Sequence, residues 1–169
     1  MDDRLLGIYL NDHLAGATAG TEISRRTAGS NAGTEYGEAL GSIAKEIESD
    51  REALREVMRA LGVAPNLAKT AFVRLAERTG RVFKLNGRIL KYSPLSRVEE
   101  LELLRIGVEG KLALWTTLKE TRAADPRLKG MDFPELARAA ERQRDRLEAM
   151  RLEAAREAFG TATNPRAKR

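Results

Sequence analysis

Four long stretches of this sequence carry apolar residues at alternating steps of three and four, the spacing that places side chains on one face of an α-helix. They cover about residues 3–27, 34–61, 96–118 and 133–159. Four amphipathic helices can bury their apolar faces together only by packing around a shared core, as they do in a helical bundle. The sequence therefore predicts an all-α protein built as a four-helix bundle.

The ends of these helices are marked by capping residues. Thr34 is expected to cap the second helix, because a threonine hydroxyl can accept a hydrogen bond from the free N–H groups of the first turn. Ser96 and Glu99 form the Ser-x-x-Glu pattern of a capping box, which predicts that the third helix starts near Ser96. Asp132 and Glu135 repeat the pattern and predict the start of the fourth helix.

The connections between the helices differ in length. Two are short, whereas the second and third helices are joined by a crossover over residues 62–95. This crossover is expected to hold one short helix near residues 67–79 and, around Asn86-Gly87, either a small hairpin over residues 81–92 or an extended strap. Two short connections and one long one predict the order up-down-down-up in a single domain, residues 1–159, followed by a flexible basic tail, residues 160–169.

Composition excludes several classes of protein. The chain has no cysteine and one histidine, so it has no disulfide, no thiolate metal site and few of the side-chain pairs that activate a nucleophile. It has no apolar run near the roughly 20 residues that cross a bilayer. These features favour a soluble, cytoplasmic protein, and they make an enzyme the less expected class.

The helix lengths, the position of the crossover and two short phrases resemble the ferritin-like superfamily, in particular small bacterial stress-associated bundle proteins. The phrases are Leu-Leu-Gly-Ile-Tyr-Leu at residues 5–10 and Glu-Ile-Glu-Ser-Asp at residues 46–50. The resemblance implies a ferritin-like up-down-down-up bundle. It also implies a site for two metal ions, held by a carboxylate on the first and third helices and a Glu-x-x-His on the second and fourth.

The chain departs from that metal motif on both helices that should carry a histidine. Glu46 is followed three residues later by Ser49, and Glu141 is followed by Arg144, whose permanent positive charge opposes a bound cation. A metal-oxidising site is therefore not expected. What the resemblance then implies is a non-catalytic interaction or stress-associated protein, which would pair as a homodimer or bind a protein partner.

Each apolar stripe is interrupted near its middle by one polar residue, namely His13, Asp50, Glu109 and Gln143. With a rise of about 1.5 Å per residue, all four are expected in one layer of the bundle. One hypothesis is that His13, Asp50 and Glu109, together with Glu46, bind a divalent metal such as zinc, manganese or iron. The other is that His13 is hydrogen-bonded to Asp50 or Glu109, with Gln143 as a bridge, in a buried network that fixes the helix register without a metal.

Small residues are concentrated where the first two helices meet. Gly16 and Gly20 lie late in the first helix, and Gly33, Gly37 and Gly41 lie at the start of the second. A glycine inside a helix costs about 1 kcal/mol relative to alanine, so a compensating role is expected. The favoured interpretation is close packing of the two backbones, and the alternative is room for a ligand or for another subunit.

The net charge of +5 is unevenly distributed. Residues 62–97 hold eight basic side chains and one acidic side chain, and the tail is also basic. The basic patch of the crossover consists of Arg81, Lys84, Arg88 and Lys91. This patch either pairs with the acidic faces of the bundle or contacts an outside partner, and nucleic acid is one alternative for that partner.

Overall fold

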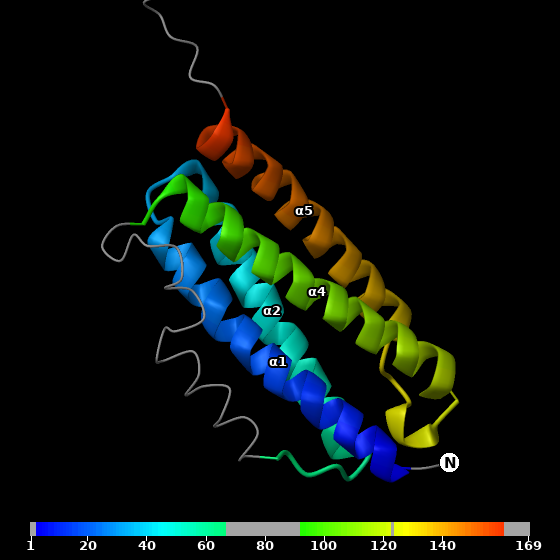
Figure 1. Cartoon of the computed structure of the whole chain (residues 1–169). Coiled ribbons are helices and arrows are strands. Elements are labelled where there is room, and N and C mark those ends of the chain that lie inside the picture. Colours follow the sequence, from blue (N-terminus) through cyan, green and yellow to red (C-terminus); the bar gives the residue numbers. More distant parts are fainter. Residues whose placement is uncertain (1–2, 67–91, 123, 161–169) are drawn as a thin grey trace, which may run out of the picture.

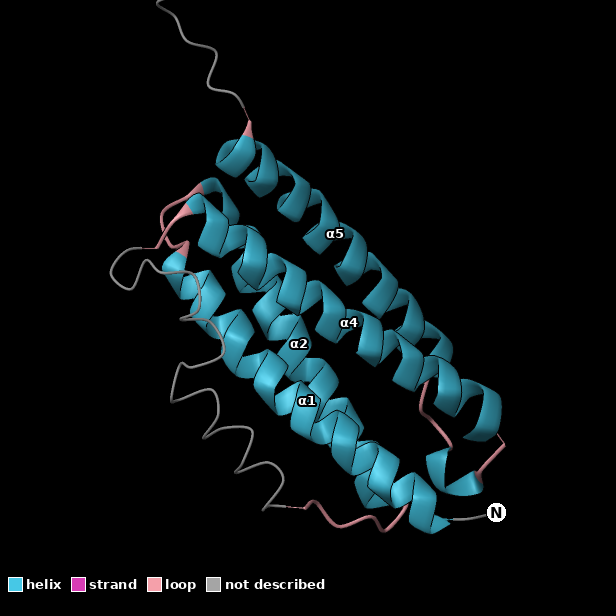
Figure 2. Ribbon diagram, in the orientation of Figure 1, coloured by secondary structure: helices cyan, strands magenta, loops and turns pink. Residues whose placement is uncertain are grey.

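The computed structural model describes residues 3–66, 92–122 and 124–160. They form four long helices, α1 (Asp3–Ser30), α2 (Glu35–Ala60), α4 (Pro94–Arg122) and α5 (Phe133–Phe159), and the short 3-10 helix η2 (Pro126–Leu128) (Figure 1). No strand occurs in the described part of the chain, as Figure 2 shows, so the all-α class is confirmed. None of these helices combines the length and the apolar character that crossing a membrane requires.

Several predictions fall on residues outside the described ranges. They are the short helix near residues 67–79, the choice between hairpin and strap over residues 81–92, the basic patch Arg81, Lys84, Arg88 and Lys91, and the tail beyond Gly160. These stay predictions.

The four helices lie nearly side by side as two helical hairpins, α1 with α2 and α4 with α5 (Figure 1). Hydrogen bonds between helix ends give their directions. Arg26, near the end of α1, pairs with Glu100 at the start of α4 at 3.3 Å, so these two helices are antiparallel. Tyr36, at the start of α2, donates from its hydroxyl to Glu157, at the end of α5, at 2.7 Å, so α2 and α5 are antiparallel as well.

The core is mainly aliphatic. Its two aromatic side chains from α4 and α5, Trp115 and Phe133, stack with ring centroids 6.5 Å apart. The core residues without measurable exposure are Leu10, Ile43, Val57, Leu101, Trp115, Leu118, Leu147 and Ala154. They come from all four helices and repeat at helical spacing, which is the pattern from which the bundle was predicted.

Two of the three predicted caps are confirmed, and one is wrong. The side chain of Thr34 accepts a hydrogen bond from the backbone N–H of Tyr36, and that of Asp132 accepts one from Glu135 at 2.9 Å. Helix α4, however, begins at Pro94, and its cap is Ser93, whose hydroxyl accepts from the N–H of Ser96 at 3.3 Å. Proline favours the first helical position because it has no N–H to satisfy there, so the helix starts before the Ser-x-x-Glu pattern.

A polar cluster joins the two hairpins where α1 ends and α4 begins. Asn31, fully buried, donates from its amide nitrogen to the hydroxyl of Tyr92 at 2.7 Å, and its amide oxygen accepts from Arg97 at 2.7 Å. Arg97 also pairs with Glu157 at 2.6 Å and lies 4.2 Å from the ring centre of Tyr36. The cluster therefore fixes the loop of one hairpin against both helices of the other.

The corrected cap gives a direct test. Replacing Ser93 by alanine should lower the free energy of unfolding by about 1 kcal/mol, because the first turn of α4 loses its acceptor. The matched change Ser96→Ala should cost clearly less, since the Ser96 hydroxyl accepts no backbone N–H of this turn. Urea denaturation of both variants measures the difference. A larger loss for Ser96→Ala would show that the helix starts where the sequence pattern placed it.

Candidate functional site

The polar cluster at mid-height of the bundle joins three helices. Lys111 of α4 donates to Oδ2 of Asp50 on α2 and to Oε1 of Gln143 on α5, and Gln143 donates from Nε2 to the same Asp50 oxygen at 3.1 Å. The side chains of Lys111 and Asp50 are only 13% and 11% exposed, so the ion pair is largely buried. The cluster is therefore a hydrogen-bonded network that fixes the relative height of α2, α4 and α5.

Burial and charge act in opposite directions on the lysine of this cluster. Removal of Lys111 from water lowers the pKa of its ammonium group, and the neighbouring Asp50 carboxylate raises it, with the net direction downward. A buried charge of this kind is retained only when its partner and its hydrogen bonds are in place. Asp50 and Gln143 supply both.

The structure brings only two of the four predicted layer residues together. Asp50 and Gln143 share the network, as the second hypothesis predicted. Among the described residues no hydrogen bond joins His13 to Asp50 or Glu109, so that part of the hypothesis is wrong, and Glu109 does not reach the network. The Glu109 side chain is 55% exposed and lies 3.9 Å from Arg144. Its place in the layer is taken by Lys111, because position 111, and not 109, falls on the inward face of α4 together with Val108 and Trp115.

Sequence reasoning missed Lys111, although a signal was present. Leu104, Val108, Lys111, Trp115 and Leu118 follow one another at steps of four, three, four and three, and all except Lys111 are fully or nearly fully buried. A lysine at such a position is usually taken as surface, because lysine is rarely buried without a partner. The partner, Asp50, interrupts the stripe of α2 in the same way.

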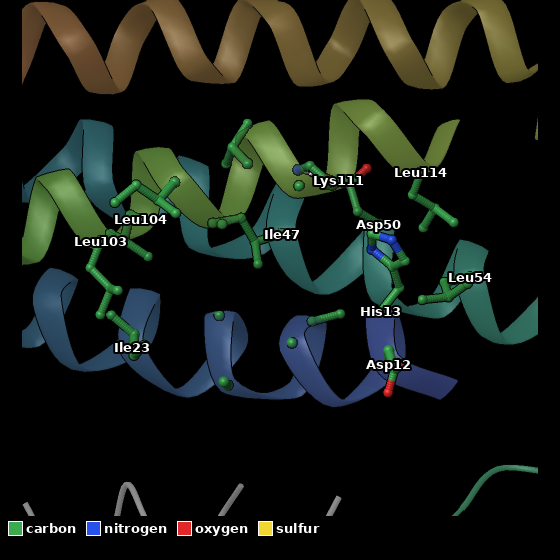
Figure 3. Close-up of a pocket in the computed structure, with 18 of the residues that line it drawn as sticks. Asp12, His13, Ile23, Ile47, Asp50, Leu54, Leu103, Leu104, Lys111 and Leu114 are labelled. Carbon is green, nitrogen blue, oxygen red and sulfur yellow. Dashed lines mark hydrogen bonds and ion pairs between the residues drawn. The ribbon is translucent and has the colours of Figure 1, made fainter. Parts of the chain in front are cut away.

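His13 lies apart from the hydrogen-bonded network but beside it. Its ring packs edge-on against Tyr9 with the centroids 4.4 Å apart, and it shares the wall of one cavity with Asp50 and Lys111 (Figure 3). Burial lowers the pKa of His13, and the charge of Asp12 offsets part of that effect. The imidazole is therefore mainly neutral at pH 7 and can both donate and accept a hydrogen bond.

The candidate metal ligands are not assembled into one site. Glu46 forms an ion pair with Arg146 and lies beside Gln143 at the edge of the network, and Glu109 faces solvent. Within the part of the chain that the structure describes, no three His, Asp or Glu side chains are grouped so that they could hold a metal ion. The geometry thus provides no ligand set for the metal hypothesis.

A cavity of about 390 Å³ lies between α1, α2 and α4 (Figure 3). Its floor is formed by buried residues from all three helices, and its rim by exposed ones. The buried lining residues are Ile23, Ile47, Asp50, Leu54, Leu104, Val108, Leu114 and Trp115, and the exposed ones are Asp12, Gly16, Ile106 and Gly107. The cavity is thus mostly apolar, open at one side, and polar only where it meets the network and His13.

Glycines make room for this cavity. Gly16 and Gly20 of α1 and Gly107 and Gly110 of α4 all line it. A Cβ atom added at Gly16, Gly107 or Gly110 would meet no atom within 4 Å, and one added at Gly20 would lie 3.9 Å from Ile47. The glycines of α1 and α4 therefore leave space open and do not bring the two backbones into contact.

The predicted close packing of the two helix backbones at these glycines is not found, and Gly37 instead lies against the loop between the helices. A Cβ on Gly37 would come within 2.8 Å of the carbonyl oxygen of Asn31, so only glycine fits against that loop. At Gly41, as at Gly16, nothing lies within 4 Å, so the close-packing interpretation is wrong there. Gly33 adopts φ +79, which serves the turn between the helices.

Trp115 is one of the residues around the cavity, and it carries a buried donor. Its side chain is 0% exposed, and its indole nitrogen has no hydrogen-bond acceptor among the described residues. Tryptophan can only donate, and a buried donor without a partner costs about 1–3 kcal/mol. This nitrogen is closed off from the cavity as well as from solvent, so the cost arises within the packing around α4.

Comparison with protein-family models, with curated proteins and with solved structures gives no match to this chain.

The buried ion pair predicts strongly coupled substitutions. Changing Asp50 to Ala should lower the free energy of unfolding by about 3–5 kcal/mol, because Lys111 is left buried without its counter-charge. Lys111→Met should also destabilise, whereas the double variant Asp50→Ala with Lys111→Met should lose much less than the sum. Chemical denaturation of all four proteins closes the cycle. Additive losses would show that the two side chains do not depend on each other.

His13 is the only histidine of the chain, so its lowered pKa can be measured without assigning other imidazole signals. Between its native pKa and about 6.5, the unfolded chain binds more protons than the native one, so stability falls as the pH drops through that window. An NMR titration of the imidazole should give a pKa below 6.5, and His13→Asn should weaken the pH dependence of unfolding. A native pKa at or above 6.5 would contradict the burial of this ring.

Proposed function

We propose that this protein is a non-catalytic helical bundle that binds a small, mainly apolar molecule in the cavity between α1, α2 and α4. The observation that carries the proposal is the cavity itself. Its volume of about 390 Å³ is typical of ligand sites, which are mostly apolar with a few polar groups at one place. In helical bundles such sites lie between the helices, as this one does.

The energetic cost of the cavity supports this role. Gly16, Gly107 and Gly110 lie inside helices, where each glycine costs about 1 kcal/mol relative to alanine. No close contact compensates for this cost, because an added Cβ at each position meets open space. The open volume also deprives the surrounding side chains of dispersion contacts. A molecule that enters the cavity would restore those contacts, which accounts for the open space.

We also propose a ferritin-like, up-down-down-up arrangement of the helices. It is supported by the antiparallel pairs α1 with α4 and α2 with α5 and by the long connection between α2 and α4. In this arrangement the middle of the bundle carries the network of Lys111, Asp50 and Gln143 where the family's metal site would lie. The stress-associated role, the pairing of two chains and the binding of nucleic acid stay predictions.

A neutral dye tests the ligand site. N-phenyl-1-naphthylamine, whose fluorescence rises in apolar surroundings, should bind to the full chain. Gly107→Leu should weaken this binding at least tenfold, because a leucine at the rim would project into the open space. The variant should keep or raise the melting temperature, since leucine is the better helix former.

Gly41→Leu is the matched control, because Gly41 lies in α2, away from the cavity lining. It should bind the dye like the parent protein. Equal binding by Gly107→Leu and the parent, or no fluorescence change with the parent, would rule out the cavity as the site.

A further inference from the structure

The polar end of the cavity defines the class of molecule that it fits. This end consists of His13 from α1 together with Asp50 and Lys111 of the buried network. We infer that the molecule bound here is an uncharged hydroxyl compound, an alcohol or a phenol with an apolar body, whose hydroxyl group forms hydrogen bonds with His13 and Asp50. This inference rests on the proposed function, because it names the chemistry of the molecule held in the same cavity.

The imidazole of His13 is available to a molecule in the cavity. The side chain lines the cavity and extends from α1 toward Asp50 (Figure 3). Neither ring nitrogen forms a hydrogen bond with another described residue, and neither is closed off from a water-sized molecule. Because the ring is mainly neutral, it offers one N–H donor and one nitrogen acceptor.

Asp50 contributes an acceptor to the same end of the cavity. Lys111 and Gln143 both donate to its Oδ2 atom. The other carboxylate oxygen, Oδ1, accepts no hydrogen bond from a described residue, and it too is open to a water-sized molecule. An ionised carboxylate can only accept, so the group that satisfies Oδ1 must be a donor.

A hydroxyl group meets both requirements. It carries one donor and two acceptor lone pairs, so it can donate to Oδ1 of Asp50 and accept from the N–H of His13. A ketone or an ether offers only acceptors and would leave Oδ1 without a donor. A charged group fits less well, because Asp50 and Lys111 neutralise each other and an added charge would be buried without a partner.

The rest of the lining selects an apolar body. Beyond the polar end, the residues around the cavity are mainly aliphatic side chains and glycines. A dry protein cavity of about 150 Å³ holds one benzene ring, so a cavity of about 390 Å³ has room for two fused rings that carry a hydroxyl. An added Cβ at Gly16 or Gly107 would meet no atom within 4 Å, so both helices leave space for a flat ring there.

Three naphthalenes test this inference on the full chain. They are 2-naphthol, 2-methylnaphthalene, in which a methyl group replaces the hydroxyl, and 2-methoxynaphthalene, which keeps the oxygen but cannot donate. Their affinities are measured by displacement of N-phenyl-1-naphthylamine. We expect 2-naphthol to bind most tightly of the three, because burial of a hydroxyl is unfavourable unless it finds hydrogen-bond partners.

His13→Phe keeps an aromatic ring and removes both nitrogens. In this variant the affinity of 2-naphthol relative to 2-methylnaphthalene should fall about tenfold, because the hydroxyl stays buried and loses one partner. Gly107→Leu is the control, because a leucine in the open space should weaken the binding of all three compounds alike.

The parent protein supplies a readout that needs no variant. His13 is the only histidine, so its imidazole gives one set of NMR signals. These signals should respond to 2-naphthol well beyond their response to 2-methylnaphthalene, because only the hydroxyl can form a hydrogen bond with the ring.

The outcomes separate this inference from the proposed function. An unchanged affinity ratio in His13→Phe, or imidazole signals that respond equally to both compounds, would overturn the bond to His13 while the cavity remains a binding site. Binding of 2-methoxynaphthalene as tight as that of 2-naphthol would overturn the donation to Asp50. If the dye binds but none of the three compounds displaces it, the inference fails alone, and if the dye does not bind, the proposed function fails as well.

Discussion

The ion pair between Lys111 and Asp50 is the interaction on which the rest of this structure depends. A lysine and an aspartate that are both nearly buried must meet at one height, and Gln143 must lie beside them to complete their hydrogen bonds. This requirement sets the register of α2, α4 and α5. Helix α1 supplies no hydrogen bond to the network among the described residues, so its inward face is free to carry glycine and alanine.

Among the described residues, the polar contacts between α1 and α4 lie on either side of the cavity, where they include a hydrogen bond from the Tyr9 hydroxyl to Thr117 at 3.4 Å. Near one end Arg122 pairs with Asp3 at 3.4 Å, and near the other Arg26 pairs with Glu100 at 3.3 Å. The stretch between these pairs contains the glycines of both helices. These contacts and the fixed register of α4 keep the cavity open before any molecule binds. A preformed site of this kind avoids the free-energy cost of ordering its walls during binding.

Periodicity and capping patterns were sufficient to predict the four helices, because a core-facing stripe and a capped first turn are local properties of the sequence. Asp50 and Gln143 were also predictable, as polar interruptions of apolar stripes. Lys111 was not recognised, because lysine is normally a surface residue and its burial depends on a partner from another helix. The cavity could not be predicted from the sequence. Gly16 and Gly107 are compatible both with close packing and with open space, and only the distance between the helices decides between the two.

The space between α1, α2 and α4 is, on this proposal, a preformed binding site for a small, mainly apolar molecule. A crystal structure of the protein soaked with N-phenyl-1-naphthylamine gives the most direct test. We expect the dye to lie between the glycines of α1 and α4, with the ion pair of Lys111 and Asp50 intact. Density for the compound elsewhere, or a structure in which α1 and α4 close together and leave no cavity, would contradict it.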